Sequence, residues 1–150
     1  MHSRATSFGY RISKLHRLVA RYIRERMATM GVEQGQVPFL AELFHEDGVP
    51  QDVLASRLFI DKGVTARQLA RMEQAGLIVR RVNEENKRQK LVFLSDDMHS
   101  RRDEFFGHLH ALTGQLGHGF SDEERPVALE FLDRMTMNML ASIKPEDGDL

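Results

Sequence analysis

The residues best suited to bind a partner are the bases between Arg57 and Lys90, a stretch with nine Lys and Arg against four Asp and Glu. Arg67 and Arg71 lie four residues apart. On a helix they would share one face, where two like charges repel by roughly a few tenths of a kcal/mol. An anionic partner explains this spacing better than solvent does. Because Arg pairs bidentately with guanine and Gln with adenine, Arg67 and Gln68 together favour DNA.

The net charge of −1 conceals an uneven distribution of charge along the chain. Residues 1–30 carry seven bases and one acid, whereas residues 31–56 carry five acids and no base. A phosphate backbone responds to the local potential, so the basic stretch 57–90 matters more than the total. The N-terminal bases are equally well explained as the solvated face of a helix.

Motifs for catalysis and metal binding are missing from the sequence. The chain has no Cys, which excludes disulfides, thiolate metal sites and Cys nucleophiles. It contains neither a Gly-x-Ser-x-Gly elbow nor the Gly-rich phosphate-binding patterns. Of seven His, the candidate metal ligands are His45, His108 and His110, but the last two are only two residues apart and point to different faces of a helix. We therefore expect neither an enzyme nor a cofactor, and zinc is disfavoured.

The length of 150 residues fits one domain, which can bury roughly 68–70% of its unfolded surface. With 41% hydrophobic and 29% charged residues, the composition excludes wholesale disorder. There is no apolar run of the roughly 18 residues that a membrane span needs. The N-terminus lacks the apolar region of a secretory signal, so we expect a cytoplasmic protein with no membrane partner.

The pattern of the first two thirds predicts a helix-turn-helix followed by a hairpin. Apolar residues at three- and four-residue steps predict helices from near Ser7 to Gly31 and from about 36 to 45. Two short helices follow, one beginning at Pro50 and one capped by Asp61 and closed by Gly76, with only residues 59–61 between them. The last of these should direct inward Val64, Leu69 and Met72.

After Gly76 the apolar period changes from 3.6 to 2, which predicts strands over 77–82 and 91–94. The polar segment 83–90 between them should form the hairpin tip and carry Lys87, Arg88 and Lys90. A hairpin placed there is a β-wing, and its bases could enter a minor groove of DNA.

The C-terminal third is predicted to be helical. One helix should run from about Asp97 to near Gly117, and another should start at Ser121, where Ser121 and Glu124 form a capping box. Residues 144–150 are acidic and should form a flexible tail. The first and last helices carry more apolar residues than a small head can cover, which indicates a homodimer interface; the alternative is one closed monomeric helical domain.

The middle of the chain resembles the MarR family of winged helix-turn-helix transcription regulators. Gln-Asp-Val-Leu-Ala-Ser-Arg-Leu at 51–58 resembles the third helix of that family, and 61–69 with 72–78 resembles its recognition helix and exit. Asn86-x-Arg88, then five residues to Leu94-Ser95, is similar to the wing signature Asp-x-Arg-x5-Leu-Thr. The resemblance implies a mainly α fold (an α+β winged helix) with a two-stranded wing. It also implies a single domain over 1–150, with a head at 34–96 and dimerisation helices at 1–33 and 97–143.

This resemblance implies a sequence-specific regulator, a ligand-responsive repressor that binds a pseudo-palindromic operator as a homodimer in a bacterial or archaeal nucleoid. The expected DNA contacts are Gln51, Lys62, Gly63, Val64, Thr65, Arg67, Gln68, Arg71, Asn86, Lys87, Arg88 and Lys90. Thr65 would touch phosphate or a thymine methyl. Two features depart from the family pattern: Asn86 replaces the usual acid that pairs with the wing arginine, and Gly63 and Val64 stand where relatives carry Ser and Thr.

An effector of such a regulator would be a small aromatic or lipophilic molecule in an apolar cleft. The candidate lining is Leu15, His16, Val19, Phe39, Leu43, Phe44 and Phe106. Plain core packing is the preferred interpretation of the same residues. Two further alternatives are a zinc-responsive regulator of the same fold and a dimeric interaction protein that does not bind DNA.

Overall fold

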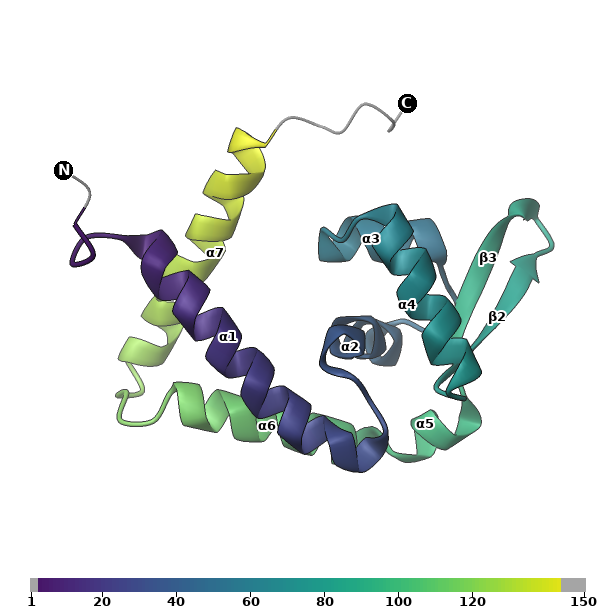
Figure 1. Ribbon diagram of the computed structural model, residues 1–150, viewed down its shortest axis with the longest axis horizontal. Helices are drawn as coiled ribbons and strands as arrows, with labels where there is room; N and C mark the ends of the chain where they lie inside the picture. Colours follow the sequence, from purple (N-terminus) through teal and green to yellow (C-terminus); the bar gives the residue numbers. More distant parts are fainter. Residues whose placement is uncertain (1–2, 144–150) are drawn as a thin grey trace. The chain divides into compact units, whose positions relative to one another are not determined.

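A computed structural model describes residues 3–143, so the predicted tail at 144–150 lies outside the described residues. The chain divides into a first unit, Met1–Leu112, and a second unit, Thr113–Leu150. The first unit holds a bundle of helices and a small sheet, and the described part of the second holds the end of one helix and a further long helix (Figure 1). Within residues 3–143, no helix combines the length and hydropathy that crossing a bilayer requires.

Helix α1 (Phe8–Met27) confirms the first predicted helix. The Ser7 hydroxyl caps it by accepting a hydrogen bond from the Tyr10 amide at 3.0 Å. A 3-10 helix, Ala28–Met30, continues it to Gly31, whose φ of +70° lies in the left-handed region that glycine tolerates. Only the C-terminal part of α1 is buried, through Ile23 and Met27.

Helix α2 (Val37–His45) lies in the core of the first unit. A short 3-10 helix, Gln34–Gln36, precedes it, and Glu33 and Gln36 form a reciprocal capping box there. Pro38 falls in the first turn of α2, where its missing N–H has no intrahelical partner. The side chains of Phe39, Leu40 and Leu43 are at most 1% exposed, so this helix is the centre around which the other elements pack.

Helices α3 (Gln51–Leu58) and α4 (Lys62–Gln74) confirm the helix-turn-helix. The turn between them bends at Phe59, which has a φ of +55°. Asp61 caps α4 as predicted, since its carboxylate accepts a hydrogen bond from the Val64 amide at 3.0 Å. Gly76, with a φ of +75°, ends the segment and directs the chain into the sheet.

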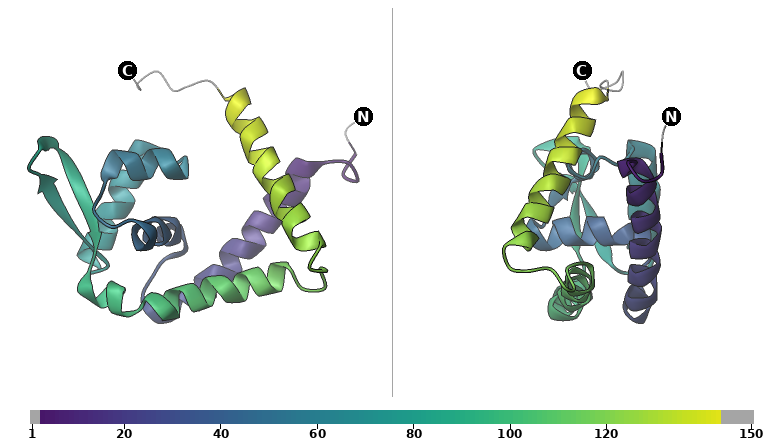
Figure 2. Two further views of the ribbon diagram at one scale, coloured as in Figure 1. Left: turned by 180° about the vertical axis from the view of Figure 1, so that it is seen from behind. Right: turned by 90° about the vertical axis from the view of Figure 1, so that its left-hand side faces the viewer.

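The sheet has three antiparallel strands rather than two. Strand β1 (Val49–Pro50) pairs with β3 (Asn86–Leu94), which pairs with β2 (Ile78–Asn83) on its other side. Two residues ending in a proline have no readable period, which is why the pattern predicted only the hairpin. Figure 2 shows the β2–β3 hairpin standing out beside α4.

The predicted hairpin tip is wrong in its extent. Residues 86–90 belong to β3 and the turn itself is only Glu84 and Glu85. Lys87, Arg88 and Lys90 therefore lie along a strand instead of at the tip. Polar residues can continue a strand when both faces of a hairpin are solvated, so a hydrophobic pattern underestimates its length.

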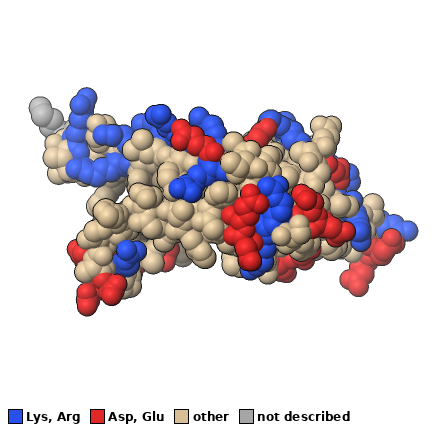
Figure 3. Space-filling model, turned by 90° about the horizontal axis from the view of Figure 1, so that it is seen from below, with Lys and Arg blue, Asp and Glu red and all other residues tan. Residues whose placement is uncertain are grey.

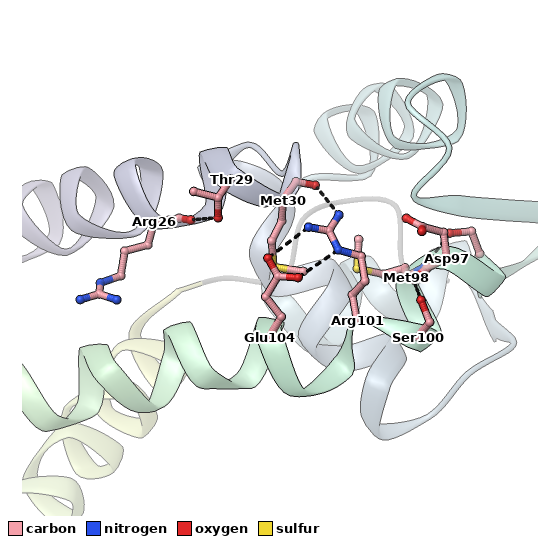
Figure 4. A network of polar contacts seen from close by, with 9 residues as sticks. Arg26, Thr29, Met30, Asp97, Met98, Ser100, Arg101 and Glu104 are labelled. Atoms are coloured by element: carbon pink, nitrogen blue, oxygen red, sulfur yellow. Dashed lines mark hydrogen bonds and ion pairs between the residues drawn. The ribbon is translucent and has the colours of Figure 1, made fainter.

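The single helix predicted over 97–117 is also wrong, because it breaks at Arg101 into α5 (Asp96–Ser100) and α6 (Arg102–Leu116). The Arg101 guanidinium donates two hydrogen bonds of 3.1 Å to Glu104 and one of 3.2 Å to the Met30 carbonyl (Figure 4). These bonds tie the break to the end of the N-terminal segment. Glu104 raises the pKa of Arg101 above its ordinary value, first through these hydrogen bonds and further through its charge.

The second unit contains helix α7 (Glu124–Ser142). The predicted hydrogen bonds of the capping box are confirmed: Glu124 accepts one from the Ser121 amide at 2.8 Å, and the Ser121 hydroxyl accepts one from the Glu124 amide at 3.1 Å. The helix itself begins at Glu124, three residues after the predicted start at Ser121. Along α7 no residue is buried, and Leu129 is 63% exposed. Against residues 3–143, this helix buries no apolar face.

Candidate nucleic-acid interface

The N-terminal half of α4 presents an exposed face. Lys62, Gly63, Val64 and Arg67 are all exposed there. The expectation that Val64 points inward is wrong, since it is 39% exposed. These are the first two turns of the second helix of a helix-turn-helix, the part that reaches base edges when such a helix enters a major groove.

Thr65 does not belong to this exposed face. It is 0% exposed, and its hydroxyl is buried without a hydrogen-bond partner among the described residues. The helical period places it on the same side as Leu69 and Met72, which are also fully buried. The predicted contact of Thr65 with phosphate or thymine is therefore wrong.

The side chains of Gln68 and Arg71 contact the segment that precedes α2. Gln68 is half-buried, and its Nε2 lies so close to Gly35 that a Cβ added there would be 3.1 Å away. Arg71 pairs with Glu33 at 2.6 Å, although its side chain remains 59% exposed. The ion pair competes with a phosphate for Arg71, while Arg67 makes no ion pair within residues 3–143.

The wing carries exposed bases along β3. Lys87, Arg88 and Lys90 are exposed, while Gln89 is half-buried and accepts a hydrogen bond from the Asn83 side chain at 3.1 Å. Asn86 does not brace the Arg88 guanidinium; its side-chain oxygen accepts from the Arg88 backbone amide at 3.3 Å. Asn86 thus shapes the turn and leaves the arginine side chain exposed.

A groove of about 370 Å³ lies where α3, α4 and the wing meet. It is lined by Gln51, Asp52, Ala66, Arg80, Arg88, Gln89 and Lys90. Three of these side chains are cationic and one is anionic, so the groove favours a negatively charged occupant. On the face in Figure 3, Lys and Arg are interspersed with Asp and Glu over the middle and the right-hand side, and much of the rest carries neither charge.

Arg80 is the residue that the sequence analysis missed. It lies on β2 with a side chain only 15% exposed, and its guanidinium donates to Glu73 of α4 and to Gln51 of α3, both at 3.2 Å. The hydrogen bond from Arg80 lowers the pKa of Glu73, and the positive charges of Arg80 and Lys90 lower it further against the opposing effect of burial. The available signal was the period of the strand, which places Arg80 on the same face as buried Ile78.

The candidate effector residues are dispersed between core and surface. Phe39 and Leu43 are core residues, whereas Leu15 and His16 are exposed and Val19 is partly buried. Phe44 and Phe106 form a packed cluster with Phe105, with ring centroids 5.1–5.4 Å apart.

No group of three His, Asp or Glu residues that could hold a metal ion occurs within 3–143. His45 is exposed with its ring 6.1 Å from that of Phe106, His108 is half-buried with an unpartnered Nε2, and His110 is exposed.

Comparison with known proteins places this geometry in a family. A family model described as MarR family matches residues 32–90. The crystal structure of a MarR transcriptional regulator from Methanosarcina mazei Go1 superimposes with a TM-score of 0.84 and 31% identity, covering 90% of this chain and 97% of that one. The chain belongs to the MarR family. Members of the family are DNA-binding transcriptional regulators and not enzymes.

Two further relatives fit this MarR assignment. The Bacillus subtilis (strain 168) protein YdgJ, described as an uncharacterized HTH-type transcriptional regulator, is 29% identical over 112 residues, which is 75% of this chain and 68% of that protein. A putative MarR family regulator from Listeria monocytogenes, solved in complex with a 26mer DNA, has a TM-score of 0.85 at 20% identity, with 91% of each chain covered. The second likeness concerns the fold alone.

Proposed function

We propose that this MarR-family chain recognises a specific DNA sequence by placing α4 in a major groove and β3 of the wing against the adjacent minor groove. The observation that carries this proposal is one cationic groove, which is lined by Ala66 of α4 and by Arg88 and Lys90 of β3. The exposed residues Lys62, Gly63, Val64 and Arg67 lie on the same helix as Ala66. A wing arginine such as Arg88 suits a narrow minor groove, where negative potential is concentrated. The Listeria monocytogenes protein of the same fold, solved in complex with a 26mer DNA, supports DNA as the partner.

On α4, Arg67 is the residue we assign to direct base readout, through two parallel hydrogen bonds to guanine. Gly63 supports it by leaving space. A Cβ at Gly63 would lie 3.4 Å from Nη1 of Arg67 and 3.1 Å from the capping carboxylate of Asp61. Lys62 and the exposed methyl groups of Val64 complete the face, the latter suited to a thymine methyl. Lys87 and Lys90 would bind phosphates.

The active form that we propose is a homodimer built from residues 1–33 and 97–143. Exposed large apolar side chains on α1 include Phe8, Ile12, Leu15 and Leu18, and those of the second unit include Phe131, Leu132 and Met139. Faces of this kind mark an interface. A two-fold dimer would recognise a pseudo-palindrome with half-sites about 10 bp apart.

Repression is the regulatory outcome that we propose, because a dimer spanning an operator excludes other proteins from the promoter. Release by a small aromatic or lipophilic effector stays a prediction, since none of the candidate residues lines the groove between α3, α4 and the wing. No specific observation favours the zinc-responsive alternative. The alternative of a dimeric interaction protein that does not bind DNA depended on Asn86 in place of the usual acid. The Asn86 side chain still accepts a hydrogen bond from the Arg88 amide and so stabilises the turn of the wing.

Sequence selectivity of the Arg67→Ala variant tests the proposed function. Affinity would be measured for a fragment spanning the protein's own promoter and for the same fragment with scrambled sequence. We expect Arg67→Ala to lose roughly 1–3 kcal/mol on the promoter and little on the scrambled DNA, because a base contact carries the selectivity. Arg24→Ala, an exposed arginine on α1, is the matched control and should bind both as the wild type does. Equal selectivity of Arg67→Ala and wild type would contradict the proposal.

A further inference from the structure

The outer part of the wing has little hydrophobic support. At its base, Leu77 and Ile78 are 5% and 2% exposed, and Val92 is fully buried. Farther out, Arg81 and Val82 on β2 and Lys87, Arg88 and Lys90 on β3 are exposed. Between the base and this outer part stands Arg80, opposite Val92 in the strand register. Arg80 is therefore a largely buried side chain at the place where the hairpin leaves the hydrophobic core of the first unit, and beyond it on β2 only Asn83, next to the turn, is again partly buried.

Arg80 links the wing to both helices of the helix-turn-helix. Its backbone amide donates to Oε2 of Glu73 at 3.1 Å, and its Nη2 donates to Oε1 of the same carboxylate at 3.2 Å. Its Nη1 donates to Oε1 of Gln51, the first residue of α3. One side chain thus joins β2 to the C-terminal half of α4 and to the start of α3.

The planar guanidinium is suited to this position. Its nitrogens are fixed in one plane, so that separate atoms reach the carboxylate on one side and the amide on the other. A lysine keeps the charge but offers a single nitrogen, which cannot occupy both donor positions. The charge of Arg80 is already matched by Glu73, so its contribution to DNA binding differs in kind from that of the exposed Arg67 and Arg88.

We propose that Arg80 is a positioning residue that fixes the wing at one distance from α4, so that Arg67 and Arg88 engage the same DNA at the same time. The inference rests on the proposed function, because it concerns how the two contacts of that function are held together. Rigid placement lets a second contact form without an added entropic cost of ordering the hairpin. Without Arg80, the hairpin tilts about its base, and the α4 contact forms while the wing contact does not.

The test is a set of double variants assayed for binding to the promoter fragment. In the wild-type background, Arg67→Ala and Arg88→Ala should each lower affinity by about tenfold, as expected for loss of one specific arginine contact. In the Arg80→Lys background, Arg67→Ala should still cost about tenfold, whereas Arg88→Ala should cost less than about twofold, because the wing contact is already lost. Arg80→Gln, which also removes the charge, should give the same pattern.

Matched variants and outcomes separate this role from simple stabilisation. Arg81→Lys is the control, since Arg81 lies next along β2, with its guanidinium 5.3 Å from the centre of the Phe93 ring, and touches neither Glu73 nor Gln51. It should leave both arginine effects unchanged. If Arg80→Lys and Arg80→Gln lower the melting temperature but both arginine effects persist at full size, Arg80 is structural only and the inference is overturned. If the effects of Arg67→Ala and Arg88→Ala persist in the Arg80 variants while the affinity of those variants for DNA depends less steeply on salt, Arg80 is a direct phosphate ligand. That result would also overturn the inference.

Failure of the inference is distinguishable from failure of the proposed function. If Arg67→Ala and Arg88→Ala have no effect in the wild-type background, the proposed function itself fails. If both matter there and their sizes do not depend on residue 80, the proposed function stands and only the positioning role falls.

Discussion

At the scale of single residues, the interface depends on which side chains of α4 face outward. Thr65 and Arg67 are two positions apart, yet Thr65 is fully buried and Arg67 is exposed. Resemblance to a family lists both among the expected DNA contacts, whereas the helical period separates them. An expected contact on a helix is therefore not credible when its neighbours four and seven residues along are both core residues, as Leu69 and Met72 are for Thr65.

Thr65 leads to a stability prediction. Its buried hydroxyl has no partner within residues 3–143, and an unsatisfied buried hydroxyl costs about 1–3 kcal/mol. We expect Thr65→Val, which replaces the hydroxyl by a methyl group, to raise the free energy of unfolding by about 1 kcal/mol without changing affinity for DNA. Urea denaturation and a binding titration measure the two quantities. A destabilised variant with weaker DNA binding would show that the hydroxyl is used.

At the scale of elements, the wing differs most from what its sequence indicates. Its bases lie along β3, and its two-residue turn is acidic, consisting of Glu84 and Glu85, both exposed. Carboxylates at the end of a hairpin repel phosphates, so the strand side of the wing is the part suited to approach DNA.

The acidic turn gives a prediction about affinity. Replacing Glu84 and Glu85 together by Gln should raise affinity for DNA by about twofold to fivefold at low salt, since each removed charge is worth no more than a screened surface interaction. The gain should vanish at high salt, where such repulsion is screened. Glu25→Gln on α1 serves as the control. An unchanged or lower affinity at low salt would mean that the turn does not approach the phosphates.

Elements with a strong local signal could be predicted from the sequence, and those fixed by distant contacts could not. Asp61, Gly76 and the Ser121–Glu124 box mark their helix ends through local hydrogen bonds or a required φ, and the structure confirms each. The break at Arg101 depends on Met30, which is 71 residues away in the chain, and β1 depends on pairing with β3. Neither the break at Arg101 nor strand β1 produces a periodic hydrophobic pattern in the sequence. Arg80 of β2 is an intermediate case. The alternation of the strand indicated that its side chain points inward, but the sequence did not indicate its partners Gln51 and Glu73.

At the scale of the whole molecule, α1 and α7 carry apolar surface that their own units do not bury. Leu18 of α1 is 62% exposed, so it stabilises little in a single chain. We expect Leu18→Glu to shift the protein from dimer to monomer in sedimentation equilibrium, because burying a charge in an apolar interface is costly. The control Arg24→Glu introduces the same residue on α1 and should remain a dimer. A dimer of unchanged strength for Leu18→Glu would remove this part of α1 from the interface.

The central claim, that the chain binds DNA directly through α4 and the wing, is tested most directly by a salt series. Affinity for the promoter fragment would be measured over a range of salt concentrations for the wild type and for Lys87→Ala. We predict a steep linear fall of log affinity with log salt, and for Lys87→Ala a slope about one unit shallower, as expected for one lost phosphate contact. Weak binding with a flat salt dependence, the same in both proteins, would contradict the account.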